Sequence, residues 1–553
     1  MNLVEYVFAA ALESDGSSRT AVACGGRSLT YSQLLASVRK FGGALKSLGV
    51  RRGERVAIVA ADCPEFVAAF LGTTAVGSVA VPASTLATPA ELEHVLSHCG
   101  ARVAVVTEDQ LDKLRSVRAR LPQIKTVLLV GEEGKSEAGG GVAGLAVAPE
   151  RVSSSGESPG GVLSSAQSLD GLLGFGEVLA AADEAEVEDV DEETPAFILY
   201  TSGSTGRPKG ATHVHRSLPH TVETYCKRVL RVSPEDRLFS SSRLFFAYGL
   251  GNSLSFPLSS GATSILCRER PTPQAIAELF ERERPTIFFA VPAVFRALLE
   301  HAARGGELKT DSISFCVSAG ERLPERIFRE WRELTGLYIL DGIGSTEMLH
   351  MFFSNTREKI RPGSSGVVVP GYEARLARRE GQEVEGEGAG DLFVKGRSAT
   401  VGYWNEPEKT ADSMRDGWVR TGDIYRRDAE GFYWFEGRGD DLFKVKGLWV
   451  FPAEIEEALL SHSEVHEVAV VPRSDADGFN SVVAFVVLAS KTAGDEATVE
   501  KLKAHLSATL PLYKCPSEFR FADSLPRTAT GKLQRFKLRE ELSNTSRSGD
   551  ATT

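Results

Sequence analysis

The feature that most constrains this chain is a buried apolar strand that runs directly into a loop of glycine, serine and threonine. Residues 196–200 read AFILY, and residues 201–210 read TSGSTGRPKG. Glycines let the backbone turn tightly and aim its N–H groups at a ligand, the hydroxyls add donors, and Lys209 adds a positive charge. The pattern predicts a polyphosphate cradle at the end of a sheet strand. It is not a Walker A loop, because Gly210 follows the lysine where that motif needs serine or threonine.

The rest of the chain predicts two domains. From residue 29 onward, short β-branched runs alternate with helical patterns, which is typical of βαβ units with largely parallel sheets. Near residues 437–447 the composition changes to that of a compact α+β unit. We therefore expect an α/β fold with a large N-terminal domain (1–439) and a small mobile C-terminal domain (440–553). Residues 131–169, rich in Gly, Ser, Ala and Glu, are expected to form a flexible surface insertion.

Composition narrows the function classes. With 42% hydrophobic and 25% charged residues, the chain of 553 residues has the composition of an ordinary globular protein. Its formal net charge of −11 argues against nucleic acid or a membrane surface as a partner. Seven cysteines without C-x-x-C spacing indicate neither a disulfide framework nor a zinc site. Because the N-terminus lacks a basic segment and no apolar run is long enough to span a bilayer, we expect a cytoplasmic protein.

Five further motifs follow the loop in a fixed order. They are SAGE (318–321), DGIGSTE (341–347), VRTGD (419–423), GRGDDLFKVKG (437–447) and PRTATGKLQR (526–535). Together with the loop they resemble the adenylate-forming superfamily, which includes the acyl-CoA synthetases, over nearly the whole chain. The resemblance implies that ATP is a substrate and that a carboxylate is joined to its α-phosphate.

The resemblance also implies which residues bind the nucleotide. Asp423 would accept hydrogen bonds from both ribose hydroxyls, and Arg438 would make a second ribose contact. Many members have an aromatic ring where this chain has Ile343, so we expect adenine to pack against an aliphatic side chain. The implied set is Thr201, Ser202, Gly203, Ser204, Thr205, Gly206, Lys209, Gly320, Glu321, Asp341, Gly342, Ile343, Asp423 and Arg438.

Three residues resemble the catalytic group of the superfamily. Glu347 would hold Mg²⁺, a hard cation suited to carboxylate and phosphate oxygens, and Thr346 would contact phosphate. Lys532 would bridge the substrate carboxylate and the α-phosphate, where negative charge develops. Taken alone, a Thr-Glu pair is more often a helix N-terminus and a lysine is more often a solvated surface residue, so these roles depend on the surrounding motifs.

The resemblance extends to the boundary between the two domains. Asp440 resembles the hinge about which the small domain rotates after adenylation, and Lys446 and Gly447 would approach the tunnel through which the thiol of coenzyme A enters. His94 and His98 stand four residues apart without a third ligand, so we expect no metal there. His213 and His215, which follow the loop, are interpreted as structural.

The acyl segments are similar to those of benzoate-CoA ligases. These segments are LFFAYGLGN (244–252) and MLHMF (348–352). Aromatic and small residues suit a flat ring, with no channel for an alkyl chain. The resemblance implies a pocket for a single-ring aryl carboxylate, such as benzoate or anthranilate, formed by Ala247, Tyr248, Ala319, Gly344, His350 and Met351.

The leading hypothesis is therefore an AMP-forming aryl-CoA ligase. Two alternatives stay open: a stand-alone adenylation enzyme that loads a separate carrier protein, and a non-catalytic nucleotide-binding regulator with the same fold. No carrier segment is recognised in the chain, which favours free CoA. The sequence leaves the oligomeric state open, with a homodimer as one candidate.

Overall fold

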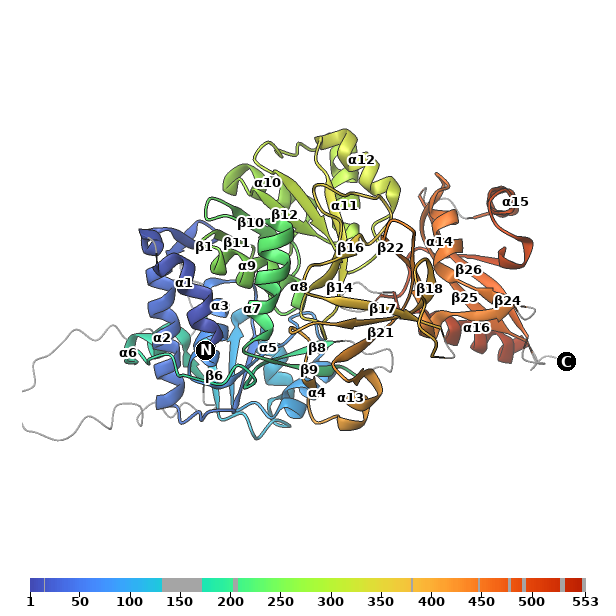
Figure 1. Cartoon of the computed structure of the whole chain (residues 1–553). Coiled ribbons are helices and arrows are strands. Elements are labelled where there is room, and N and C mark those ends of the chain that lie inside the picture. Colours follow the sequence, from blue (N-terminus) through green and yellow to red (C-terminus); the bar gives the residue numbers. More distant parts are fainter. Residues whose placement is uncertain are drawn as a thin grey trace, which may run out of the picture.

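The computed structural model describes residues 1–13, 15–131, 172–201, 207–378, 381–445, 448–475, 479–489, 494–527 and 533–549. Mixed α/β structure is divided between a large N-terminal domain and a smaller C-terminal one, drawn in orange and red in Figure 1, which confirms the predicted fold class. The insertion expected at 131–169 lies outside the described residues from residue 132 onward. The exact boundary at residue 440 and the mobility of the small domain stay predictions.

The predicted strand at 196–200 is β8 (Pro195–Thr201), near one end of an eight-stranded sheet. The strands β8, β4, β3, β5, β6 and β7 run parallel to one another. Beyond β8 the sheet continues with β9 and β19, each of which pairs antiparallel with the strand before it. The strand order is β19 (Gly402–Tyr403), β9 (Lys209–Val214), β8, β4 (Val79–Pro82), β3 (Arg55–Val59), β5 (Val103–Thr107), β6 (Thr126–Val130) and β7 (Leu172–Gly174).

A second, nine-stranded sheet forms the other half of the large domain. Its central strands are parallel and its two edges are antiparallel. The order is β16 (Val367–Val368), β15 (Met351–Ser354), β14 (Ile339–Gly344), β13 (Phe315–Ser318), β12 (Ile287–Ala290), β10 (Arg237–Ser240), β11 (Thr263–Leu266), β1 (Thr20–Cys24) and β2 (Arg27–Thr30).

The two sheets share one core. Helix α3 (Pro64–Ala75) is buried along almost its whole length and contributes Phe66 and Phe70 to the same apolar cluster as Ile58 of the first sheet and Phe289 of the second. Such a helix reads as apolar on all sides in the sequence. The remaining helices of the large domain are α1 (Leu3–Leu12), α2 (Tyr31–Ser47), α4 (Pro89–Cys99), α5 (Glu108–Arg118), α6 (Phe175–Ala181), α7 (Ser217–Thr221), α8 (Ala247–Leu250), α9 (Phe256–Ser259), α10 (Pro273–Glu283), α11 (Pro292–Ala303), α12 (Glu325–Thr335) and α13 (Pro407–Ser413).

A third sheet and the small domain complete the chain. The third sheet is antiparallel and contains β17 (Glu373–Ala377), β18 (Gly388–Lys395), β20 (Met414–Arg415), β21 (Trp418–Arg427) and β22 (Tyr433–Arg438). The small domain is an α+β unit, as predicted, and contains β25 (Val465–Ser474), β26 (Asn480–Leu488), α14 (Pro452–Leu460) and α15 (Glu496–Ser507). Beside them lie β23 (Phe443–Val445), β24 (Leu448–Val450), β27 (Glu518–Phe521) and α16 (Arg535–Gly549).

Among the helices of the described ranges, none combines the length and the apolar character needed to cross a membrane.

The packing of α2 generates a stability prediction. An added Cβ at Gly43 would overlap the carbonyl oxygen of Asp183, whereas one at Gly176 in α6 would meet no atom within 4 Å. We expect Gly43→Ala to lower the free energy of unfolding by about 1–3 kcal/mol through overpacking. Gly176→Ala is the matched control and should be neutral or stabilising by up to about 1 kcal/mol. Calorimetric melting of both variants checks this, and equal melting temperatures would contradict it.

Candidate active site

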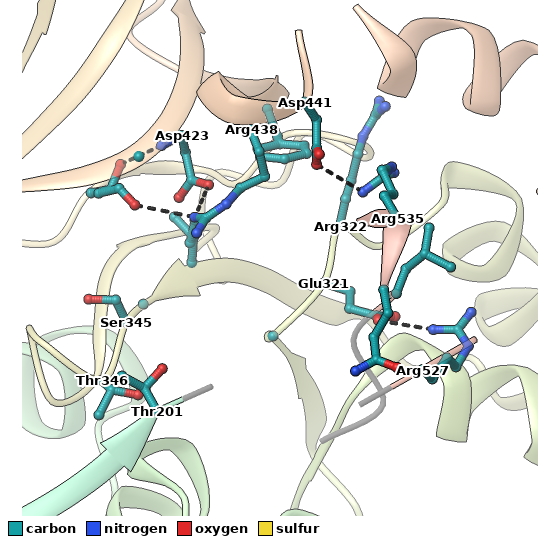
Figure 2. A pocket seen from close by; sticks show the side chains of 18 of the residues that line it. Thr201, Glu321, Arg322, Ser345, Thr346, Asp423, Arg438, Asp441, Arg527 and Arg535 are labelled. Carbon is teal, nitrogen blue, oxygen red and sulfur yellow. Dashed lines mark hydrogen bonds and ion pairs between the residues drawn. The ribbon is translucent and has the colours of Figure 1, made fainter. Parts of the chain in front are cut away.

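A cleft of about 1430 Å³ lies where the large domain meets the small one. Figure 2 shows that its labelled side chains come from several sheets and from both domains. The predicted site residues that line it are Thr201, Lys209, Gly320, Glu321, Gly342, Ile343, Gly344, Thr346, Glu347, Asp423, Arg438 and Asp440. Other predicted residues lie outside the described part of the chain: Ser202, Gly203, Ser204, Thr205, Gly206, Lys446, Gly447 and Lys532.

Asp423 and Arg438 face each other across two neighbouring strands. They are register partners in β21 and β22, and Arg438 Nη1 donates to Asp423 Oδ1 at 2.6 Å. Asp423 is only 7% exposed, and its negative charge raises the pKa of Arg438. The pair places an anionic acceptor and a cation side by side at the cleft wall, which suits a ligand that carries both hydroxyl donors and phosphate.

Glu347 is oriented by a residue that the sequence analysis missed. Tyr403 donates its hydroxyl hydrogen to Glu347 Oε1 at 2.8 Å, and Lys209 Nζ lies 5.2 Å from the centre of the Tyr403 ring. Burial, and then the nearby charge of Glu347, raise the pKa of Tyr403, so this phenol stays a donor. Because 56 residues separate the two partners, no local motif could have indicated the contact.

His213 ties the strand after the phosphate loop to the Thr346 segment. Its Nε2 lies 2.8 Å from the Thr346 carbonyl oxygen, and its ring stacks on Phe197 of β8 at 5.2 Å. Burial lowers the pKa of His213 to about 4, so the imidazole is neutral near pH 7. A neutral imidazole that donates from Nε2 fits this contact. His213 therefore supports the loop and the Thr346 turn from behind.

Strand β14 separates the cleft from the predicted acyl residues. Asp341, a predicted nucleotide-binding residue on this strand, is not among the residues that line the cleft. It is 4% exposed, and burial raises its pKa to about 8. An added Cβ at Gly342 would lie 2.5 Å from the carbonyl oxygen of Phe353, and one at Gly344 would overlap the His350 carbonyl. These glycines let β15 approach β14 closely. Gly344 lines the cleft on one side and pairs with Met351 on the other.

The structure brings the predicted acyl residues together as a ring cluster behind Gly344. The ring of His350 lies 5.6 Å from that of Tyr248 and 4.5 Å from that of Phe256. Burial lowers the pKa of His350 to about 3, and its Nε2 contacts Asn252 Oδ1 at 3.1 Å. Ala247, Ala319, His350 and Met351 are all buried, and Tyr248 is partly buried.

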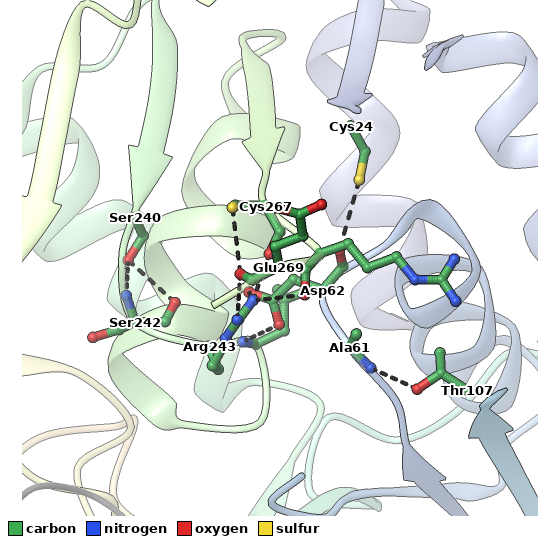
Figure 3. A network of polar contacts seen from close by, with 11 residues as sticks. Cys24, Ala61, Asp62, Thr107, Ser240, Ser242, Arg243, Cys267 and Glu269 are labelled. Carbon is green, nitrogen blue, oxygen red and sulfur yellow. Dashed lines mark hydrogen bonds and ion pairs between the residues drawn. The ribbon is translucent and has the colours of Figure 1, made fainter. Parts of the chain in front are cut away.

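A buried carboxylate holds the start of the acyl segment. Asp62 Oδ1 accepts a hydrogen bond from the backbone N–H of Leu244 at 3.1 Å, and its Oδ2 lies 3.9 Å from Arg243 Nη1. Figure 3 shows the Arg243 guanidinium reaching past Asp62 toward Glu269, whose carbonyl oxygen it meets at 2.5 Å. Burial raises the pKa of Asp62 to about 6, although the charge of Arg243 opposes that shift. The network links residues far apart in the chain, so no local sequence pattern indicated it.

The small domain contributes cations to the opposite wall. Arg527 and Leu533, the described residues that flank the TGK motif, pair as an isolated antiparallel bridge and both line the cleft. Arg535 pairs with Asp441 at 3.3 Å and with both carboxylate oxygens of Glu456 at 2.7 Å.

His94 and His98 each contact a neighbouring polar group through a ring nitrogen. His94 Nε2 contacts the carbonyl oxygen of Pro208 at 3.2 Å, and His98 Nδ1 contacts the hydroxyl of Tyr200 at 2.8 Å. Within the part of the chain that the structure describes, no three His, Cys, Asp or Glu side chains are grouped so that they could hold a metal ion.

Comparison with known families gives two consecutive matches. Residues 8–404 match the family described as AMP-binding enzyme, and residues 454–532 match the AMP-binding enzyme C-terminal domain.

Relatives and solved structures resemble the chain over almost its whole length. It is 40% identical to a benzoate–CoA ligase of Thauera aromatica, covering 93% of this chain and 90% of the relative. A 4-hydroxybenzoate–CoA/benzoate–CoA ligase of Rhodopseudomonas palustris is 38% identical, with 93% and 89% covered. The crystal structure of an anthranilate CoA ligase in complex with anthranoyl-AMP matches with a TM-score of 0.86 at 33% identity, covering 99% of this chain and 98% of that one. A benzoate CoA ligase from Burkholderia xenovorans LB400 matches with a TM-score of 0.83 at 37% identity, with 98% and 100% covered.

The burial of His213 predicts a pH dependence of stability. Above pH 6.5 the residue is neutral in both states and contributes no slope. As the pH falls from 6.5 toward 4, only the unfolded chain takes up the proton, so stability falls by up to about 3 kcal/mol. His213→Gln keeps an N–H donor for Thr346 but cannot titrate, so its stability should fall less between pH 7 and pH 4.5.

Thermal unfolding of both proteins at these two pH values measures the difference. His301→Gln, at a partly exposed histidine of α11, is the control for the exchange of an imidazole for an amide. An unchanged slope in His213→Gln would contradict the prediction.

Proposed function

Because the chain belongs to the AMP-binding enzyme family, we propose that it is an AMP-forming aryl-CoA ligase. A carboxylate oxygen of a single-ring aryl acid attacks the α-phosphorus of ATP, and the bond to pyrophosphate breaks. The thiol of CoA then attacks the carbonyl carbon of the aryl-adenylate, loses its proton, and AMP leaves. Similarity to benzoate–CoA and anthranilate–CoA ligases along nearly the whole chain supports this reaction.

The observation that carries the proposal is the position of β14. The carboxyl end of this strand, Gly342 to Gly344, lines the cleft that holds Asp423, Arg438 and Thr346, and Gly344 adjoins the ring cluster of Tyr248 and His350. A nucleotide in the cleft and a flat ring beside Gly344 would bring the carboxylate and the α-phosphate together at one point. Catalysis then depends on holding the two reactants in this geometry.

For the nucleotide, we assign Asp423 to the ribose hydroxyls and Arg438 to a ribose contact. Thr201, Lys209, Gly320, Gly342, Ile343 and the loop residues Ser202 to Gly206 would surround the phosphates and the base. Support comes from the cleft, which has Lys209 at one side and the Asp423–Arg438 pair at another. Ile343 would supply an apolar contact to adenine, in place of the aromatic ring that many family members have at this position.

Glu347 is proposed as the residue that holds Mg²⁺. Mg²⁺ commonly takes one or two carboxylates and completes its shell with substrate phosphates and water. A single carboxylate, oriented by Tyr403, fits this ligand set. Its chemistry would be to neutralise phosphate charge.

Lys532 is proposed to bridge the attacking carboxylate and the α-phosphate. Its support is the setting of its described neighbours, since Arg527 and Leu533 both line the cleft. Asp440, next to the partly buried Asp441, is proposed as the hinge, with Lys446 and Gly447 on the path of CoA. We also propose a cytoplasmic location, because seven free cysteines suit a reducing compartment.

An acid panel tests the proposed function. AMP release should be highest with benzoate or anthranilate, lower with 4-hydroxybenzoate and phenylacetate, and lowest with octanoate and acetate, because aromatic and small residues suit a flat ring better than an alkyl chain. The assay compares kcat/KM with and without CoA. Turnover that depends on a carrier protein and not on CoA would favour the stand-alone adenylation enzyme. Octanoate or acetate exceeding every aryl acid would overturn the substrate assignment.

A second prediction concerns Lys532. Lys532→Ala should slow adenylation by about 10² to 10⁴, because attack of one anion on another loses its bridging cation, whereas thioester formation from supplied aryl-adenylate persists. Pyrophosphate exchange and thioester assays measure the two half-reactions. Lys503→Ala removes an exposed lysine of α15 that does not line the cleft and serves as the control. Equal loss of both half-reactions in Lys532→Ala would reject this role.

A further inference from the structure

Two neighbouring residues of opposite charge join the large domain to the small one. They follow Gly320, whose φ of +92° turns the chain sharply between β13 and α12. The two Nη atoms of Arg322 donate to the two carboxylate oxygens of Glu457 on α14, both at 2.7 Å. Glu321 Oε1 accepts a hydrogen bond from Arg527 Nη1 at 3.3 Å (Figure 2). The turn that lines the nucleotide cleft is thus also a contact point for the small domain.

A second contact lies beside the first. Glu467 of β25 accepts from Arg296 Nη2 of α11 at 3.2 Å and from Arg527 Nη2 at 2.9 Å. Burial alone would raise the pKa of Glu467, but the hydrogen bond and charge of Arg527, together with the charge of Arg296, lower it. Arg296 Nη1 also donates to the carbonyl oxygen of His466 at 3.3 Å.

The signs of these charges specify one arrangement of the domains. Arg296, Glu321 and Arg322 of the large domain form ion pairs with Glu467, Arg527 and Glu457 of the small domain, respectively. Glu467 also pairs with Arg527. An isolated exposed ion pair contributes little to stability. A guanidinium group that bonds both oxygens of one carboxylate, and a carboxylate shared by two guanidinium groups, require a definite geometry. Another orientation would break the pairs or oppose like charges, so the network acts mainly on orientation.

We propose that this charge network, formed by Arg296, Glu321, Arg322, Glu457, Glu467 and Arg527, positions the small domain for the adenylation half-reaction. The inference rests on the proposed function. Arg527 stands five residues before Lys532 in the sequence, so anchoring Arg527 restricts where the segment of that lysine can lie. The six are positioning residues and take no part in bond making. In this proposal, transfer to CoA follows a rotation of the small domain about the proposed hinge at Asp440 and does not need the network.

Charge reversal tests the network on the small domain. Glu457 is half-exposed, so Glu457→Arg leaves the cores intact while placing a cation against Arg322. Benzoate-dependent ATP–pyrophosphate exchange should fall about tenfold, because an attraction becomes a repulsion at close range. Thioester formation from synthetic benzoyl-adenylate and CoA should stay within about twofold of wild type. Adding Arg322→Glu to the same chain should restore most of the exchange.

A matched control and a second variant distinguish the loss of the interdomain contacts from a general effect of charge reversal. Glu454→Arg makes the same change on the same helix, but Glu454 pairs with Lys514 inside the small domain, at 2.5 Å. It should leave the ratio of the two half-reactions unchanged. Arg296→Gln breaks the other contact and should lower exchange without lowering transfer.

Three results would overturn the inference: an unchanged ratio in both Glu457→Arg and Arg296→Gln, an equal effect of Glu454→Arg, or a double variant no better than Glu457→Arg alone. Absence of aryl-dependent exchange in the wild-type protein would instead overturn the proposed function.

Discussion

Mutual repulsion between a carboxylate and a triphosphate is the constraint on which the proposed reaction and its site depend. Both reactants are anions, and the chain itself carries a net charge of −11, so the cations that screen them have to be placed locally. The cleft does this from several directions. Lys209 begins β9, Arg438 is paired across β21 and β22, and Arg527 and Arg535 of the small domain line the same cleft. Both domains contribute residues to the wall of the cleft, so its cations come from both.

Much of the fold could be predicted because its elements have local signals. The strand before the glycine-rich loop, the helix α14 and the strands β25 and β26 each show the period of their own secondary structure. The antiparallel sheet of β17, β18, β20, β21 and β22 was not anticipated. Its pairing, such as Asp423 with Arg438, is decided by long-range contacts and not by composition within any one strand.

The candidate site likewise contains residues that local motifs predicted and residues that they did not. The motifs identified Thr346, Glu347, Asp423 and Arg438, because each lies in a short run of characteristic residues, and the structure gathers these four at one cleft. Their supporting partners were missed. Tyr403 reaches Glu347, His213 reaches Thr346, and Asp62 reaches the backbone of Leu244 across long stretches of sequence. A single sequence carries no record of such contacts, since each partner alone looks like an ordinary core or surface residue.

The fate of the carboxylate oxygens tests the central chemistry most directly. Benzoate labelled with ¹⁸O at both carboxyl oxygens can be incubated with the protein, ATP and CoA, and the nucleotide products analysed by mass spectrometry. If the carboxylate attacks the α-phosphorus, one labelled oxygen leaves with AMP when CoA displaces it, and pyrophosphate carries no label. Label in inorganic phosphate together with ADP, or unlabelled AMP alongside benzoyl-CoA, would contradict the account.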